Sequence, residues 1–403
     1  MPKADVPFPP LAIAALSFAA FASAASARVA DPLLPRLDAE FGIGLGAAAQ
    51  VVTAFSIAYG VLQAFYGPIG DRFGKYRVVA WGCAASAFTA LFCALAPNFS
   101  ALVIARFIAG STAAAVIPLS IAWIGDVVPY ERRQSVLARF LTGQIFGFAS
   151  GQLVGGLAAD YWNWRVPFVA VAVWFAAAAA MLLRMNRGIA APPAMPRDPG
   201  RSVTHRLWAD FGYVLRQRWA RVVIVTVFLE GAAMFGPFAF LPTHLHLAYG
   251  LSLSVAGGCL MLYGAGGLAF AGLAPFLVRR LGEAGLAAGG GIVLCSALLL
   301  VGLASSWPLA LVACFLAGLG FYMLHNTLQT NATQMAPERR GAAVALFASS
   351  LFLGQAVGVA VASLWVERIS TTPIIVTGGI SLLAIGLVFA RLRAAHKARP
   401  ATH

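Results

Sequence analysis

Charged residues are scarce in this sequence. Only 10% of its 403 residues are Asp, Glu, Lys or Arg, whereas 60% are hydrophobic and the mean hydropathy is +0.83. A water-soluble chain of this length needs a much larger charged surface. The composition therefore excludes an ordinary soluble protein and indicates a membrane protein.

Several chemical signatures are also missing. There is no G-x-x-x-x-G-K-[ST], no H-E-x-x-H and no serine nucleophile elbow, so the chain does not look like an ATP-driven pump or an enzyme. We expect no cofactor and no metal site, and we place His244 and His246 at the membrane interface. The cysteines form no C-x-x-C pair and are interpreted as apolar packing residues: Cys83, Cys93, Cys259, Cys295 and Cys314.

What the sequence has instead is long apolar stretches. About 20 such residues cross a bilayer as a helix, and the absence of period-two alternation favours helices over a barrel. We predict twelve spans: Pro10–Ala30, Ala47–Tyr66, Val78–Ala96, Ala101–Ile124, Val136–Ala159, Val166–Leu183, Val222–Pro242, Leu253–Leu277, Ala284–Ala304, Trp307–Thr330, Ala342–Trp365 and Pro373–Ala390.

The net charge of +14 has an uneven distribution along the chain. If the N-terminus is cytoplasmic, 23 of the 28 Lys and Arg fall in cytoplasmic loops and tails, and only Arg36, Arg165 and Arg368 fall outside. This positive-inside bias predicts cytoplasmic termini in a bacterial inner membrane. It assigns the basic charge to the surface of the lipid bilayer and argues against nucleic-acid binding.

The two halves of the chain contain matching segments. Gly147 and Gly151 pair with Gly354 and Gly358 at an offset of 207 residues, and so do the clusters Glu131-Arg132-Arg133 and Glu338-Arg339-Arg340. Gly110 pairs with Gly318 at an offset of 208. Matches in register indicate a duplicated six-helix unit. We therefore predict an N-terminal bundle (1–183), a cytoplasmic linker (184–221) with a short surface helix near 205–215, and a C-terminal bundle with a basic tail (222–403).

The segment from Gly67 to Arg77 predicts a tight charged turn between two spans. Its glycines permit close approach and positive φ, and its pattern G-x-x-x-D-R-x-G-K-x-R resembles the signature loop of the major facilitator superfamily, between the second and third helices. The residues that carry the pattern are Gly67, Gly70, Asp71, Arg72, Gly74 and Lys75. The resemblance covers nearly the whole chain. It implies an all-α membrane fold of twelve helices in two six-helix repeats, and secondary transport of a small molecule.

The resemblance also implies a role for this loop. Asp71 would lie against the positive N-terminal end of a facing helix, and Arg72 or the cluster Glu131-Arg132-Arg133 would complete an ionic latch on the cytoplasmic face. In the family such a latch holds the outward-open state.

Two further segments resemble motifs of the drug and metabolite:proton antiporter branch. Gly147, Gly151, Gly155 and Gly156 follow the pattern G-x-x-x-G-P-x-x-G-G, with Gln152 in place of the proline. Ordinary helix packing through small residues is the alternative. Arg106 and Gly110 match an R-x-x-x-G core in which the arginine is implicated in proton transfer, although Ala109 replaces the usual glutamine.

Ionisable residues inside a bilayer need a partner or a water-filled cavity. Here they are Arg28 and Asp31 at the outer end of helix 1, Arg106 in helix 4, Glu230 in helix 7 and His325 in helix 10, and the resemblance implies that these four helices line the cavity. Glu230 stands alone in an apolar segment, where desolvation disfavours the carboxylate and favours proton exchange; a structural hydrogen bond is the alternative. Asp31 either takes part in transport or ends its helix. His325 is placed in a polar patch with Asn326, Gln329 and Asn331, for substrate hydrogen bonding or for packing.

Together these features predict a proton-coupled exporter of amphipathic small molecules, acting as a monomer with protons as the coupling ion. A sugar or metabolite carrier, indicated by the amides near His325, is the alternative within transport. A membrane receptor without transport is the alternative outside it, and flux in proteoliposomes separates the two classes.

Overall fold

The structure of this protein is a computed structural model that describes residues 10–186 and 203–397. The side chains of a few residues inside these ranges, Glu131 among them, are not described, and residues 187–202 of the predicted linker lie outside the described residues. We call residues 10–186 the first half and residues 203–397 the second half.

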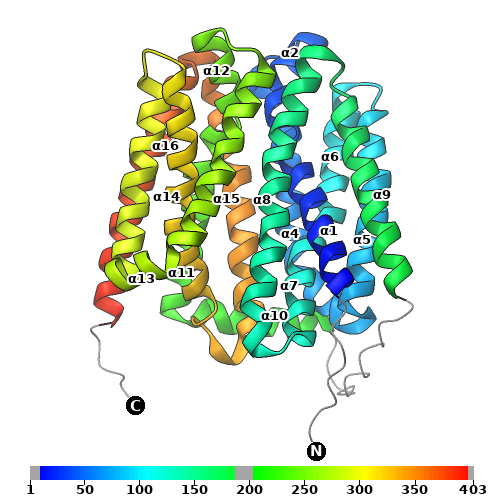
Figure 1. Ribbon diagram of the computed structural model, residues 1–403, viewed down its shortest axis with the longest axis vertical. Helices are drawn as coiled ribbons and strands as arrows, with labels where there is room; N and C mark the ends of the chain where they lie inside the picture. The colour runs from blue at the N-terminus through cyan, green and yellow to red at the C-terminus, as the bar shows by residue number, and fades with distance from the viewer. Residues whose placement is uncertain (1–9, 187–202, 398–403) are drawn as a thin grey trace, which may run out of the picture.

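The described chain is a bundle of helices standing side by side (Figure 1). Ten of its helical segments are long and apolar enough to cross a membrane. The helices are α1 (Pro10–Arg28), α2 (Leu34–Phe41), α3 (Leu45–Ala48), α4 (Gln50–Phe73), α5 (Lys75–Ala94), α6 (Phe99–Ala113), α7 (Val116–Val127), α8 (Tyr130–Tyr161), α9 (Val166–Asn186), α10 (Val203–Arg216), α11 (Arg218–Phe238), α12 (Leu241–Tyr249), α13 (Leu253–Leu303), α14 (Pro308–Ala332), α15 (Arg340–Ile369) and α16 (Thr371–Lys397), with 3-10 turns η1 (Asp31–Leu33) and η2 (Pro337–Arg339).

Different helices lie at the two ends of the bundle. α1 begins and α16 ends at the lower end in Figure 1, where α10 also lies, whereas α2 and α12 lie at the upper end. We call the lower end the terminal end and the upper end the distal end. The short helix predicted near 205–215 is present as α10.

α13 is interrupted by one residue with a non-helical backbone conformation. Gly282 has φ 61° and ψ −179°, outside the helical region. Glycine adopts a positive φ without the steric cost that a Cβ imposes. The break falls between the predicted spans Leu253–Leu277 and Ala284–Ala304, so α13 contains a helical segment for each of them.

The predicted turn at Gly67–Arg77 is wrong over most of its length. α4 continues through Gly67 and Pro68 to Phe73, and α5 begins at Lys75. Only Gly74 leaves the helical region, with φ 91° and ψ 117°, and its N–H donates to the carbonyl of Gly70 at 2.8 Å. One glycine with positive φ is sufficient to redirect the chain, so no longer turn is required.

Glycines set the closest helix contacts. A Cβ on Gly147 or Gly151 of α8 would collide with the carbonyl oxygens of Phe21 and Ala25 in α1. Gly354 and Gly358 of α15 lie in the same way against Phe228 and Ala232 of α11. Both members of each contact are thus shifted by 207 residues, the offset found in the sequence. Small residues at these positions let two membrane helices approach closely.

Two large buried clusters, and a small one of Phe270, Leu286 and Met323, form the interior of the described chain. One large cluster consists mainly of residues between Ala12 and Leu182, and the other of residues between Val214 and Phe389. All five cysteines are buried and free, as predicted from their apolar surroundings.

Candidate transport site

Glu230 and His325 form a buried pair. The Glu230 side chain on α11 is fully buried, and its Oε2 lies 2.8 Å from Nδ1 of His325 on α14. Glu230 is the sole ionisable residue of its apolar segment, and its partner comes from a different helix, which the sequence alone does not specify. Its second oxygen, Oε1, is buried without a hydrogen-bond partner among the described residues. The pair can thus hold a proton and still offer one free acceptor.

Aromatic rings surround the pair. Phe321, one turn before His325 on α14, stacks on the imidazole with a centroid distance of 4.8 Å and an interplanar angle of 10°. Phe347 of α15 lies 5.4 Å from the same ring, and Phe235 of α11 lies 5.3 Å from Phe321. The His325 side chain is 14% exposed, so it is the accessible member of the pair.

Arg28 and Asp31 form a second buried cluster. Nη1 of Arg28 lies 3.7 Å from Oδ2 of Asp31, and both side chains are buried. The Asp31 Oδ2 also accepts a hydrogen bond of 2.9 Å from Nε2 of Gln152 on α8. Gln152 is the residue that replaces the proline of the glycine motif, and in this chain it supplies a hydrogen bond to a carboxylate. Asp31 therefore does more than end a helix.

Gln355 links this cluster to the second half of the protein. Its Oε1 accepts a hydrogen bond of 2.9 Å from Nη2 of Arg28, and its Nε2 donates one of 2.8 Å to Oγ of Ser56 on α4. Gln355 lies on α15, whereas Arg28 and Ser56 lie in the first half. The Arg28 guanidinium also sits 4.2 Å from the ring centroid of Phe235, a distance at which a cation and an aromatic face attract.

Arg106 joins three helices of the first half. From α6 its Nε donates to the carbonyl of Val51 on α4 at 3.1 Å, and its Nη1 donates to the carbonyl of Ser26 on α1 at 3.0 Å. Its guanidinium carbon lies 4.2 Å from the centre of the Phe55 ring. Nη2 has no partner among the described residues. Arg106 thus packs between three helices and keeps a buried guanidinium among them.

The predicted polar patch around His325 is divided. Asn331 donates a hydrogen bond of 2.9 Å to Oε2 of Glu283, which also pairs with Nε of Arg393 at 2.6 Å. Asn326 is partly buried and Gln329 is exposed. The structure thus pairs His325 with Glu230 and places Asn331 in a separate cluster, so the amides do not form one binding surface.

The residues proposed as a cytoplasmic latch lie at the terminal end. Asp71 pairs with Lys75 at 3.3 Å, and Lys75 pairs with Asp126 at 2.6 Å, all within the first half. The guanidinium of Arg72 lies 5.1 Å from the ring centre of Phe73. Arg132 is exposed, and the side chain of Glu131 lies outside the described part of the chain. In this conformation the ion pairs described for Asp71 and Lys75 do not cross between the halves.

His244 is buried inside the protein, although the sequence places it at the membrane interface. Its Nδ1 lies 2.8 Å from Oγ1 of Thr371, and its Nε2 lies 3.1 Å from the carbonyl of Val301. It joins α12 to α16 and α13. His246 is partly buried, with Nδ1 2.6 Å from the carbonyl of Leu251. Each imidazole thus has hydrogen-bond partners that a sequence pattern does not reveal.

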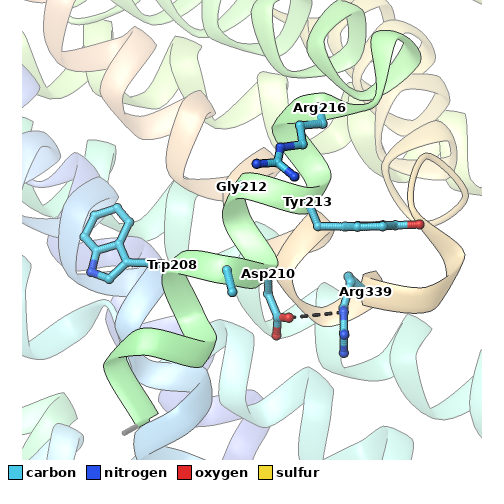
Figure 2. Close-up of a pocket in the computed structure, with 7 residues that line it drawn as sticks. Trp208, Asp210, Gly212, Tyr213, Arg216 and Arg339 are labelled. Carbon is cyan, nitrogen blue, oxygen red and sulfur yellow. Dashed lines mark ion pairs between the residues drawn. The ribbon is translucent and has the colours of Figure 1, made fainter. Parts of the chain in front are cut away.

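A shallow pocket lies where α10 meets η2 (Figure 2). Asp210 of α10 pairs there with Nε of Arg339 at 3.1 Å, and Tyr213 donates a hydrogen bond of 3.0 Å to Glu338. On its other side α10 packs towards the first half, because the Trp208 ring lies 6.3 Å from that of Phe65 on α4. The pocket is a surface feature of the linker helix and contains none of the buried charges described above.

A helical bundle with buried charges between its helices defines a polytopic membrane protein, and comparison with known proteins identifies its class. The family model of the Major Facilitator Superfamily matches residues 16–359. The chain therefore belongs to this superfamily and is a transporter of the MFS type. It is a multi-pass membrane protein, and its bacterial relatives point to the inner membrane.

Two relatives align over most of the chain. The uncharacterized MFS-type transporter YceJ of Bacillus subtilis (strain 168) is 26% identical over 347 residues, covering 82% of this chain and 83% of YceJ. The quinolone resistance protein NorA of Staphylococcus aureus (strain MRSA252) is 24% identical over 376 residues, covering 91% of this chain and 92% of NorA.

Solved structures share the fold at low sequence identity. A POT family transporter in complex with 5-aminolevulinic acid aligns with a TM-score of 0.78 and 13% identity, over 96% of both chains. The human organic anion transporter MFSD10 (TETRAN) aligns with a TM-score of 0.72 and 17% identity, over 94% of this chain and 100% of that chain. At such identity the likeness concerns the fold alone.

Proposed function

We propose that this protein is a proton-coupled exporter of amphipathic small molecules that works by alternating access. The observation that carries the proposal is the Glu230–His325 pair, a fully buried carboxyl group 2.8 Å from an accessible imidazole. NorA, the quinolone resistance protein, is a relative over nearly the whole length of both chains, which supports export of drug-like compounds.

The pair can exchange one proton for one cationic group. With a single proton shared between Glu230 and His325 the pair is neutral, which a buried site tolerates. When that proton leaves, the pair carries one negative charge that is costly to bury and that a cationic substrate neutralises. Proton and cation therefore compete, and each lowers the apparent affinity of the other. The free Oε1 of Glu230 would accept a hydrogen bond from the cation.

The surroundings of the pair favour an aromatic, amphipathic cargo over a sugar. Phe235, Phe321 and Phe347 offer ring faces close to the pair. The sugar-carrier alternative relied on the amides near His325, and one of them, Asn331, is already bonded to Glu283. A carrier of sugars or polar metabolites is therefore the second candidate function.

We further propose twelve spans in two six-helix repeats, with 1–183 and 222–403 as bundles and 184–221 as a cytoplasmic linker. The break at Gly282 supports two spans within α13. The equivalent glycine contacts in the two halves support the duplication.

The positive-inside bias supports cytoplasmic termini, which would make the terminal end of the bundle cytoplasmic. Trp208 on α10 is 63% exposed and suits labelling after Trp208→Cys. A membrane-impermeant thiol reagent should reach this cysteine only after the cells are opened. Labelling in intact cells would contradict the proposed orientation.

The test of function is flux in proteoliposomes that contain only this protein. The panel should hold cationic, zwitterionic, neutral and anionic aromatic compounds of similar size together with several sugars, each measured with and without a pH gradient. We expect cationic aromatic compounds to move fastest and to respond to the gradient. Movement of sugars alone would favour the metabolite carrier, and absence of flux for the whole panel would contradict the proposed export of amphipathic compounds.

A further inference from the structure

Two carboxylates accept hydrogen bonds between the halves at the distal end. Asp160, near the end of α8, accepts hydrogen bonds from the N–H groups of Leu253 at 3.0 Å and Ser254 at 2.6 Å, at the start of α13. Glu367, near the end of α15, accepts one of 3.1 Å from the N–H of Gly46. Each bond joins a side chain of one half to the backbone of the other half.

The two contacts are related by the internal repeat. Asp160 and Glu367 are 207 residues apart, and Gly46 and Ser254 are 208 apart. These are the offsets that relate the glycine contacts within the two halves. The same type of bond is therefore built twice, with the roles of the halves exchanged.

Close backbone packing accompanies both contacts. A Cβ on Gly156, one turn before Asp160, would collide with the carbonyl of Leu253, and a Cβ on Gly46 would collide with the carbonyl of Ser363. Ser363 lies 207 residues after Gly156, so this packing is repeated too. Each carboxylate thus sits beside a tight crossing of the two halves.

We propose that Asp160 and Glu367 form a pair of distal latches that hold the halves together in this conformation and that open when the protein turns outward. The inference rests on the proposed alternating access. A hydrogen bond from a backbone N–H to a carboxylate is charge-assisted. Asp160 also lies at the N-terminus of α13, where the partial positive charge of the helix dipole attracts a carboxylate. Both contributions exist only while the distal end is closed.

The test compares three acids at the same end of the molecule. Asp160→Ala and Glu367→Ala each remove bonds between the halves. Asp38→Ala is the matched control, because Oδ1 of Asp38 accepts a hydrogen bond of 2.8 Å from the N–H of Gly44 within one half. All three variants lose a carboxylate that accepts a hydrogen bond from the backbone. Only Asp160→Ala and Glu367→Ala lose a hydrogen bond between the halves.

Spin-label distances report the conformational balance. Labels after Glu40→Cys on α2 and Leu247→Cys on α12 sit on exposed positions of different halves at the distal end. A second pair, after Arg77→Cys and Arg280→Cys, reports the terminal end. The five native cysteines would be replaced first, with the flux of that background as reference.

Each latch substitution should raise the ratio of distal-open to distal-closed molecules about three- to tenfold, because Asp160 and Glu367 are exposed and solvent weakens a charge-assisted hydrogen bond. The double variant should raise the ratio by about the product of the two single effects, since the two contacts share no residue. The terminal-end distance should shorten in parallel, and Asp38→Ala should leave the ratio unchanged.

The outcomes separate the latches from the transport mechanism. If the background protein and all variants show one unchanging distance at both ends, with or without a transported compound, alternating access itself is refuted. If the background protein alternates but the latch variants match Asp38→Ala, only the latches are refuted. If the double variant does not fold, the two single variants are compared with Asp38→Ala by the same ratio of distal-open to distal-closed molecules.

Discussion

Gln355 offers a direct prediction about the buried contact between the halves. Its side-chain amide accepts from Arg28 and donates to Ser56, and the side chain is 1% exposed. Replacement by leucine keeps the approximate volume and removes both bonds. Because the bonds run from α15 to the first half, their loss should weaken the closed arrangement more than it weakens either bundle.

The size of the effect follows from the two bonds. A hydrogen bond to a charged group contributes about 1.5–3 kcal/mol and a neutral one about 0.5–1.5 kcal/mol. Gln355→Leu should therefore destabilise this conformation relative to the outward-facing one by about 2 kcal/mol or more, a change of about 30-fold in their ratio. Gln355→Glu should act in the opposite direction, because a carboxylate facing Arg28 would strengthen the contact and slow transport.

The assay is the distal spin-label distance, together with flux in proteoliposomes. Gln63→Leu is the matched control, since Gln63 is a buried glutamine of α4 whose Nε2 has no partner among the described residues. Opposite shifts for Gln355→Leu and Gln355→Glu, with none for Gln63→Leu, would support the reasoning. Shifts in the same direction, or none at all, would refute it, because a folding defect cannot move the balance both ways.

Two further predictions concern the first half. Arg106→Ala should lose gradient-driven flux more than gradient-free exchange. Arg106→Lys should keep part of the driven flux, because Arg106 interacts electrostatically with Asp31 and lysine keeps the positive charge. Equal losses of folded protein in both variants would indicate only a packing role for Arg106. Asp71→Asn should reduce the transport rate while thermal stability and substrate affinity stay close to wild type, because its partly exposed pair with Lys75 contributes only about 0–1 kcal/mol here. A normal rate at normal expression would count against a latch role for Asp71.

Much of the fold was predictable because a bilayer restricts the choices. Apolar stretches of span length had to be helices, and the break at Gly282 falls where two predicted spans are separated. The sequence predicts too long a turn at Gly67–Arg77, because a glycine signals either irregular backbone or close helix packing and the sequence does not distinguish the two. Only Gly74 leaves the helix, whereas Gly70 serves close packing against Leu119 and Lys75.

The site was predictable in its residues but not in its pairings. The cost of burying charge identified Glu230, Arg28 and Asp31 from their positions alone. Pairing Glu230 with His325 needs the relative rotation of α11 and α14, which a single sequence does not specify. Gln355 was missed because an uncharged glutamine in an apolar helix gives little signal. Asp160 and Glu367 could have been found, since they lie 207 residues apart, the offset of the matching segments.

Gradient-driven flux of Glu230→Gln tests the central claim most directly. The probe is the cationic compound that the wild type moves fastest, measured in proteoliposomes against Glu283→Gln, which makes the same change at a carboxylate paired with Arg393. Glutamine resembles the protonated carboxyl group and cannot release a proton. We predict that Glu230→Gln abolishes the response to the pH gradient and weakens cation binding about tenfold or more, while Glu283→Gln keeps the response. Full gradient dependence in folded Glu230→Gln would contradict Glu230 as the proton site.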